Sequence, residues 1–162
     1  MAVYSDASWC VANSISGGLV TFRGSAVHWW SRRQKSVSSS TAEAEIFAAA
    51  LASRETLYVR DFLADLGFGM TAPTPLYLDN KAAIDLALDP VAFKNTKHIL
   101  RHTYELRDRV ARSVYAPVFV PSAEQLADIL TKGLRTAPHW TLLQRLLDVS
   151  ALPRVPVAAA ET

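Results

Sequence analysis

The hydrophobic pattern of the chain first changes its period near residue 41, and this change limits the folds that the chain can adopt. Before it, strand-forming residues dominate three short runs at 3–11, 19–22 and 26–31, which Gly-containing turns separate. After it, apolar side chains recur at helical spacing over 41–66, and Gly67 ends the pattern. The runs predict an antiparallel meander, and the repeat predicts one long amphipathic helix.

The rest of the chain alternates between helical and strand-like segments. Short apolar runs at 76–78 and 115–120 predict two further strands. Helical patterns occupy four segments between and after them: 81–88, 96–112, 123–134 and 140–149. Three consecutive strands followed by alternating helices and strands indicate an α/β fold, in which helices cover a mixed sheet.

Length and composition indicate one domain. A chain of 162 residues is long enough for a single core but short for two. We expect the domain to occupy 1–150, and the Pro- and Ala-rich tail at 151–162 to be disordered. The single cysteine, Cys10, excludes a disulfide framework and a four-cysteine zinc site, and it favours a reducing compartment.

No segment of the sequence is typical of secretion or of membrane insertion. The first residues lack the basic and apolar regions of a signal peptide. The longest apolar stretch, at 46–52, is much shorter than the roughly 20 residues that span a bilayer. We therefore expect an intracellular, cytoplasmic protein that is not secreted and has no membrane partner.

The charges are nearly balanced but unevenly distributed. The formal net charge is +2, from 17 basic and 15 acidic residues. Basic residues cluster at 32–35 and again over 94–112, whereas several acids stand alone among apolar neighbours. This distribution favours a polyanion that is bound with the help of metal ions. Each basic cluster taken singly is more typical of solvated surface charge.

Four of the isolated acids are candidate metal ligands: Asp6, Glu45, Asp79 and Asp128. Asp6 lies inside the first strand run and Asp79 closes the fourth, whereas Glu45 and Asp128 lie on helical segments. If the fold gathers them, they repel one another without cations, and hard oxygen ligands select Mg²⁺ or Mn²⁺. Two such ions about 4 Å apart bind the attacking and leaving oxygens of a phosphodiester. Taken singly, each acid is also compatible with a turn, a helix cap or a solvated surface.

Five motifs occur in series along the chain: YSDASW at 4–9, SRRQKSVSSSTAEAE at 31–45, YLDNKAAIDLALDP at 77–90, NTKHI at 95–99 and VPSAEQLADILTKGL at 120–134. With these motifs the chain resembles the ribonuclease H domain of the Pol polyprotein of copia-type LTR retrotransposons. A single tetrapeptide carries little weight, but five in the family's order form a specific signal. The resemblance implies a ribonuclease H-like fold with a mixed five-stranded sheet, three antiparallel strands first and then two that alternate with helices.

The resemblance also implies an active site with acids in the order Asp, Glu, Asp, Asp. Matched motif by motif, the catalytic and metal-binding residues are Asp6, Glu45, Asp79 and Asp128. Glu43 is the alternative to Glu45, but the apolar residues after Glu45 fit the motif better. The implied reaction is hydrolysis of the RNA strand of an RNA–DNA hybrid with two Mg²⁺ or Mn²⁺ ions, which leaves 5′-phosphate and 3′-hydroxyl ends. Asp6 would bridge both ions, Glu45 and Asp79 would complete one shell, and Asp128 the other.

Residues expected to bind the hybrid fall into two groups. Ser8, through nearby backbone groups, and Asn80 are candidates to read the 2′-hydroxyl of the RNA strand. Five basic residues are candidates to hold phosphates of the other strand: Arg32, Arg33, Lys94, Lys97 and Arg101. Trp29 and Trp30 face opposite ways in a strand, so at most one reaches nucleic acid.

Some features depart from the family's pattern. Cellular ribonucleases H often carry a histidine in the loop before the last helix, but none stands between 120 and 128 here. His98 and His102 are spaced for a two-histidine metal pattern, although a structural or surface role is more typical of such a pair.

Alternative functions remain open beside the enzyme. One alternative is an inactive module that binds the hybrid. Another is a structural partner that depends on the reverse transcriptase domain of the same polyprotein. An integrase or transposase of the same superfold is a further alternative, but those end in a catalytic Glu, whereas LADIL at 126–130 supplies Asp. We expect a monomer in isolation, with a retroelement's virus-like particle as one possible location.

Overall fold

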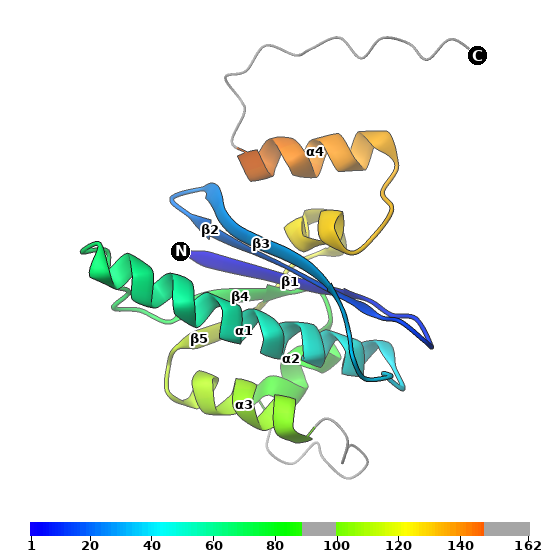
Figure 1. Ribbon diagram of the computed structural model, residues 1–162, viewed down its shortest axis with the longest axis horizontal. Coiled ribbons are helices and arrows are strands. Elements are labelled where there is room, and N and C mark those ends of the chain that lie inside the picture. Colours follow the sequence, from blue (N-terminus) through cyan, green and yellow to red (C-terminus); the bar gives the residue numbers. More distant parts are fainter. Residues whose placement is uncertain (89–99, 148–162) are drawn as a thin grey trace.

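The computed structural model describes residues 1–88 and 100–147. Within them, the chain forms a five-stranded sheet in the order β3-β2-β1-β4-β5 (Figure 1). The first three strands, β1 (Ala2–Ser8), β2 (Ile15–Phe22) and β3 (Ser25–Arg33), pair in antiparallel fashion. They form the meander that the three short runs predict.

Two parallel strands extend the meander beyond β1. β4 (Thr74–Leu78) lies parallel to β1, and β5 (Tyr115–Phe119) lies parallel to β4. Parallel neighbours need a crossover connection, which the helices of this chain supply. The mixed sheet, with three antiparallel strands first and two that alternate with helices, confirms the predicted fold class.

Helical elements cover both faces of the sheet (Figure 1). One face packs against α1 (Thr41–Asp65), with α2 (Lys81–Leu88) and α3 (Leu100–Ala111) beside it. The opposite face carries three shorter elements: the 3-10 turns η1 (Ser122–Glu124) and η2 (Leu126–Leu130) and the helix α4 (Thr136–Leu147). The sheet is therefore the middle layer of the fold.

Alternation along β2 divides the core between the two faces. Val20 belongs to the larger apolar cluster, which lies on the α1 side and includes Ile46, Leu76 and Leu106. Its neighbour Leu19 belongs to a smaller cluster with residues of η2 and α4: Leu126, Leu142 and Leu146. Burying a side chain of this size contributes about 1.5–3 kcal/mol, so the α1 side holds most of the hydrophobic stabilisation.

A capping box fixes the start of α1. The Ser40 hydroxyl accepts a hydrogen bond from the Glu43 N–H at 3.2 Å. The Glu43 carboxylate in turn accepts hydrogen bonds from the backbone N–H and the hydroxyl of Ser39, both at 2.5 Å. The helix predicted over 41–66 is confirmed at 41–65. The Glu43 carboxylate is thus occupied at the start of the helix, where Ser40 is the cap.

Gly17 and Gly18 lie inside β2, so the prediction of a turn at these residues is wrong. At both positions, the missing side chain lets another part of the chain come close to β2, and the backbone does not turn. A Cβ at Gly18 would lie 1.9 Å from Trp30 Cζ2, and a Cβ at Gly17 would lie 2.5 Å from Thr131 Cγ2. Gly17 thus lets the segment around η2 press against the sheet.

The continuous helix predicted over 123–134 is also wrong, because this segment forms the short turns η1 and η2. Gln125 lies between them and is fully buried, and its side-chain N–H donates to the Ser5 carbonyl at 3.0 Å. Its side-chain oxygen accepts from the Ala127 N–H at 3.2 Å and caps η2. These bonds tie the segment to β1 and compete with a regular helix.

Some sequence predictions lie outside the described residues. These include the disorder of the tail at 151–162 and the contacts of Lys94, Lys97 and His98. Within the described ranges, no helix is both long and apolar enough to cross a membrane. The last described helix, α4, begins at Thr136 rather than at 140.

Candidate active site

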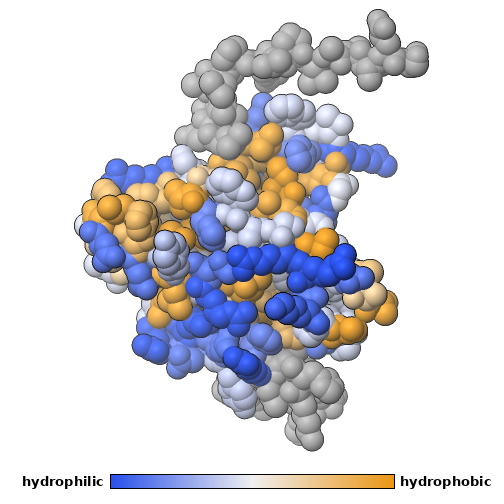
Figure 2. All heavy atoms as spheres, viewed as in Figure 1, coloured by the Kyte–Doolittle hydropathy of each residue, from blue (hydrophilic) through white to orange (hydrophobic). Residues whose placement is uncertain are grey.

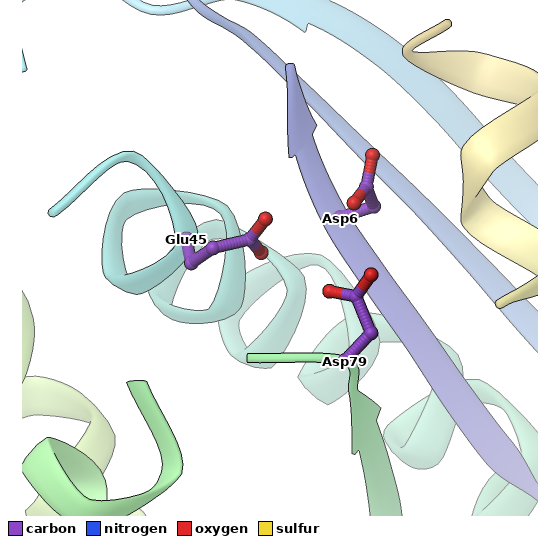
Figure 3. Close-up of side chains that lie close together, drawn as sticks. All are labelled: Asp6, Glu45 and Asp79. Carbon is purple, nitrogen blue, oxygen red and sulfur yellow. The ribbon is translucent and has the colours of Figure 1, made fainter. Parts of the chain in front are cut away.

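Three of the four predicted acids meet at one edge of the sheet. Asp6 lies near the end of β1, and Asp79 follows β4 directly. Because β1 and β4 are parallel and Tyr4 pairs with Tyr77, Asp6 and Asp79 lie at the same level of neighbouring strands. Glu45, in the second turn of α1, points toward them (Figure 3).

These three residues, which we call the acidic triad, form a compact group of oxygen ligands. Each offers a carboxylate oxygen, and these oxygens all lie within 4.8 Å of one another. Asp6 and Glu45 are buried, whereas Asp79 is half-buried and accepts a hydrogen bond from the Ser122 hydroxyl at 2.8 Å. Buried carboxylates this close repel one another unless a cation or a proton intervenes.

The surroundings of Glu45 oppose its ionisation. Its Oε1 accepts a hydrogen bond from the Ala7 N–H at 3.2 Å, but its Oε2 is buried with no hydrogen-bond partner among the described residues. Burial, together with the charges of Asp6 and Asp79, raises the pKa of Glu45 to about 9. An unpaired buried carboxylate oxygen beside two further acids suits a hard divalent cation such as Mg²⁺ or Mn²⁺.

Asp128, the fourth predicted acid, lies outside the triad and is joined to Asp6 through Lys132. The Lys132 ammonium lies 2.8 Å from Asp128 Oδ1 and 3.2 Å from Asp6 Oδ1, so it bridges the two carboxylates. The Thr131 hydroxyl donates to the other oxygen of Asp6. Burial raises the pKa of Asp128 to about 6, against the hydrogen bond from Lys132. We call Asp6 and Asp128 with this lysine the lysine-bridged pair.

The sequence analysis missed Lys132 and Thr131. Both belong to the LADILTKGL motif, three and four residues after Asp128, a spacing that brings side chains to one side of a helical turn. A basic residue one turn after an isolated acid is the signal that points to Lys132. Its second contact, with Asp6, joins residues 126 positions apart and has no local signal.

An open groove leads to the acidic triad. Its volume is about 520 Å³, and it is lined by the triad and eight further residues: Ala7, Ser8, Trp9, Thr41, Asn80, Lys81, Ala82 and Lys132. Ser8 and Asn80, the candidates for reading a 2′-hydroxyl, therefore lie at the site. Asn80 has a structural role as well, because its side-chain oxygen accepts from the Ala83 N–H at 3.2 Å at the start of α2.

A second depression lies between β3, α1 and α3. Its volume is about 420 Å³, and four cationic residues line it: Arg32, Arg33, Lys35 and Arg54. Hydrophilic residues gather over β3 and the adjoining part of α1 on the face that Figure 2 shows. Arg32 is already paired with Glu55 at 2.5 Å, which leaves it less free to hold a phosphate.

The other predicted contacts lie apart from the triad. Arg101, on α3, is exposed and lies 3.3 Å from Glu105. His102 packs edge-on against Phe47 and belongs to no group of metal ligands within the described residues. Trp29 is exposed and Trp30 is buried, as expected for neighbours in a strand.

The sheet order and the long helix that packs against the sheet define a ribonuclease H-like fold, and the acids lie at the ends of β1 and β4. Two solved structures share this fold. LC11-RNase H1 in complex with an RNA/DNA hybrid matches with a TM-score of 0.60 and 15% identity, over 80% of this chain and 91% of that chain. The N-terminal ribonuclease H domain of Rv2228c from Mycobacterium tuberculosis matches with a TM-score of 0.57 and 13% identity, over 88% and 95%.

Sequence relatives narrow the class further. The chain is 33% identical over 157 residues to the retrovirus-related Pol polyprotein from transposon RE1 of Arabidopsis thaliana, which covers 94% of this chain. It is 35% identical over 119 residues, 74% of this chain, to the Pol polyprotein from transposon TNT 1-94 of Nicotiana tabacum. No protein-family model matches the chain. The chain is thus a homologue of one segment of plant retrotransposon Pol polyproteins, and it spans about a tenth of their length.

Proposed function

We propose that the chain is a ribonuclease H that hydrolyses the RNA strand of RNA–DNA hybrids. The observation that carries the proposal is the acidic triad, with its three carboxylate oxygens within 4.8 Å and the unpaired buried oxygen of Glu45. The ribonuclease H fold and the relationship to retrotransposon Pol polyproteins support the same activity. Reverse transcription leaves such a hybrid, and the products would carry 5′-phosphate and 3′-hydroxyl ends.

The acids fit a site for divalent metal ions. Asp6, Glu45 and Asp79 would hold one Mg²⁺ or Mn²⁺ ion, and Asp6 with Asp128 would hold a second. Such ions activate a water molecule and stabilise the charge on the leaving oxygen. The residues of the chain align the carboxylates: the Ala7 N–H orients Glu45, the Ser122 hydroxyl orients Asp79, and the Thr131 hydroxyl orients Asp6.

The groove supplies candidate contacts for the nucleic acid. Ser8 and Asn80 border the triad, where they would distinguish a strand that has a 2′-hydroxyl. Arg32 and Arg33 line the second depression, where they would hold phosphates of the DNA strand, with Arg101 farther along α3. The hybrid in the LC11-RNase H1 complex supports this substrate class.

The second candidate function is a hybrid-binding or structural domain that works only with a reverse transcriptase partner. Lys132 favours it, because an ammonium between Asp6 and Asp128 opposes a second metal ion. The small share of the Pol polyproteins that the chain spans also leaves room for such a partner. Under either function, the cytoplasm or a virus-like particle is the proposed location.

Cleavage of a labelled RNA–DNA hybrid tests the proposal. The purified chain is incubated with Mg²⁺ or Mn²⁺ beside single-stranded RNA, duplex RNA and an Asp79→Asn variant. We expect metal-dependent cleavage of the hybrid alone, lost in the variant. No cleavage by folded protein with either metal would overturn the autonomous enzyme. Activity that appears only on addition of the reverse transcriptase domain would favour the second candidate.

A further inference from the structure

Lys132 lies where the two acids of the lysine-bridged pair face each other. Its ammonium contacts Asp6 at 3.2 Å and Asp128 at 2.8 Å. The Asp6 side chain is 1% exposed and that of Asp128 is 11% exposed, whereas that of Lys132 is 37% exposed. The lysine therefore reaches in from the solvent-accessible groove, which it also lines.

We propose that Lys132 is the built-in counter-ion of the lysine-bridged pair and that a divalent ion binds between Asp6 and Asp128 only when the lysine leaves. The inference rests on the proposed function, because it concerns the second of the two proposed ions. It assigns Lys132 as a positioning residue that keeps the two acids together in the absence of that ion.

The charges of the site support this assignment. Asp6 and Asp128 are held together by the fold, and two buried carboxylates in contact distance of one group need a positive charge between them. Lys132 supplies that charge, whereas Glu45 Oε2 in the triad has no partner in the described part of the chain. At Glu45, therefore, only an external cation or a proton relieves the repulsion, whereas the lysine-bridged pair has a cation of its own.

The shape of the lysine side chain makes an exchange feasible. Lysine carries a compact ammonium on a flexible four-carbon stem, and its partly exposed position lets the ammonium swing into the groove. An ammonium and a divalent ion on the same carboxylate oxygens repel each other, so only one of them occupies the pair at a time. Thr131 keeps Asp6 oriented through a separate hydrogen bond in either state.

This competition sets an order of ion binding. The triad takes its ion first, because no cationic side chain of the described residues contacts Glu45. The second ion then binds with reduced affinity, since it has to displace Lys132. The released ammonium lies at the groove, where a phosphate of the nucleic acid would accept it.

Calorimetric titration with MnCl₂ tests the inference without any measurement of cleavage. The wild type is compared with Lys132→Met and with Lys132→Gln, which removes the charge but keeps a polar group. Lys81→Met is the matched control, because Lys81 lines the same groove but its ammonium lies over the Phe119 ring at 5.0 Å. We expect both Lys132 variants to bind a second ion about tenfold more tightly or better, and Lys81→Met to match the wild type.

Thermal unfolding gives a second, metal-free measurement. In EDTA, Lys132→Met should melt several degrees below the wild type, because Asp6 and Asp128 lose their counter-ion. Saturating Mg²⁺ should close most of that gap, since the ion replaces the lost charge. A gap that stays the same with and without Mg²⁺ would overturn the inference.

The outcomes separate this inference from the proposed function. If the wild type and both Lys132 variants bind the second ion equally, the inference is wrong and the triad with its proposed activity stands. If the variants gain an ion but the wild type cleaves no hybrid, Lys132 has the proposed role, and the proposed ribonuclease H activity is wrong. If no protein binds any ion, both proposals are wrong.

Discussion

The acidic triad and the lysine-bridged pair share Asp6 but differ in how their charge is balanced. In the triad, the buried Glu45 keeps one carboxylate oxygen without a partner among the described residues. In the pair, Lys132 contacts both acids. Because one half of the site already holds an ammonium and the other holds none at Glu45, we expect the two halves to bind cations with different affinities, although the four acids look alike in sequence.

The two halves also rest on different supports. The triad is held by β1, β4 and α1, which enclose the larger core cluster. Asp128 and Lys132 are held by η2 and the residues after it, next to the smaller cluster. A larger core resists displacement better, so we expect the triad to tolerate distant substitutions better than the pair.

Asp6→Asn tests the element that the two halves share, and it should have the largest effect. Losing one charge from both proposed ion sites removes several kcal/mol of stabilisation of the transition state, or about a thousandfold or more in rate. Single-turnover cleavage of a hybrid measures the loss. Asp85→Asn is the control, because Asp85 is an exposed acid on α2 outside the groove. Equal rates for Asp6→Asn and the control would contradict a shared role.

A pair of matched variants separates the halves. Glu45→Gln should abolish tight Mn²⁺ binding, because it removes the charged ligand that no cationic side chain of the described residues contacts. Asp128→Asn should lower the cleavage rate by a smaller factor, about ten- to a hundredfold, and leave the tight ion in place. Calorimetry and cleavage assays on the two variants measure the difference. Loss of the tight ion in Asp128→Asn would show that the halves are not distinct.

The triad was largely predictable from the sequence. Asp6 and Asp79 were predicted from their places in the motifs and at the strands, and the parallel pairing of β1 and β4 supplies the physical reason that they lie together. The choice of Glu45 over Glu43 rested on the motif, and the structure supplies its physical reason. The Glu43 carboxylate is bonded to Ser39 at the start of α1, and Glu45 faces the other two acids.

The contact of Lys132 with Asp6, which completes the lysine-bridged pair, was not predictable from local patterns. The apolar spacing around Asp128 indicated a continuous helix. Instead, one hydrogen bond from Gln125 to Ser5, far away in the chain, and the bond by which Gln125 caps η2 hold this segment in short turns. The sequence predicted a turn at Gly17, whereas the residue lies inside β2 and allows a close approach of Thr131. Both misses concern contacts between distant segments, which no local period records.

The pH dependence of stability should differ between the halves in the absence of metal. Glu45 has a pKa near 9 in the folded chain and about 4.5 when unfolded, so the folded state binds more protons between these values. The contribution of Glu45 to the stability of the folded chain is therefore fully present below pH 4.5 and is lost as the pH rises toward 9. For Asp128 the corresponding window ends near pH 6.

Chemical unfolding in EDTA between pH 5 and 9 measures this difference. We expect wild-type stability to fall with rising pH by an amount on the order of a few kcal/mol. Above pH 6, Glu45→Gln should flatten the plot of stability against pH, while Asp128→Asn should leave the slope of that plot unchanged. Mg²⁺ should reduce the fall, because it favours the ionised triad. A slope that survives Glu45→Gln would assign the effect to other groups.

Gly17→Ala should have the smallest effect and should act on the lysine-bridged pair alone. A Cβ at Gly17 would lie 2.5 Å from Thr131 Cγ2 and 3.0 Å from Leu130 Cβ, so the residues after Asp128 have to shift. Overpacking of this kind costs about 1–3 kcal/mol. Gly69→Ala is the control, because a Cβ there meets nothing within 4 Å.

Denaturant unfolding should show the loss only in Gly17→Ala, and Mn²⁺ titration should find the triad's ion bound as in the wild type. Weaker binding of that ion would mean that the support of the triad extends through η2, and the two halves would then be one mechanical unit.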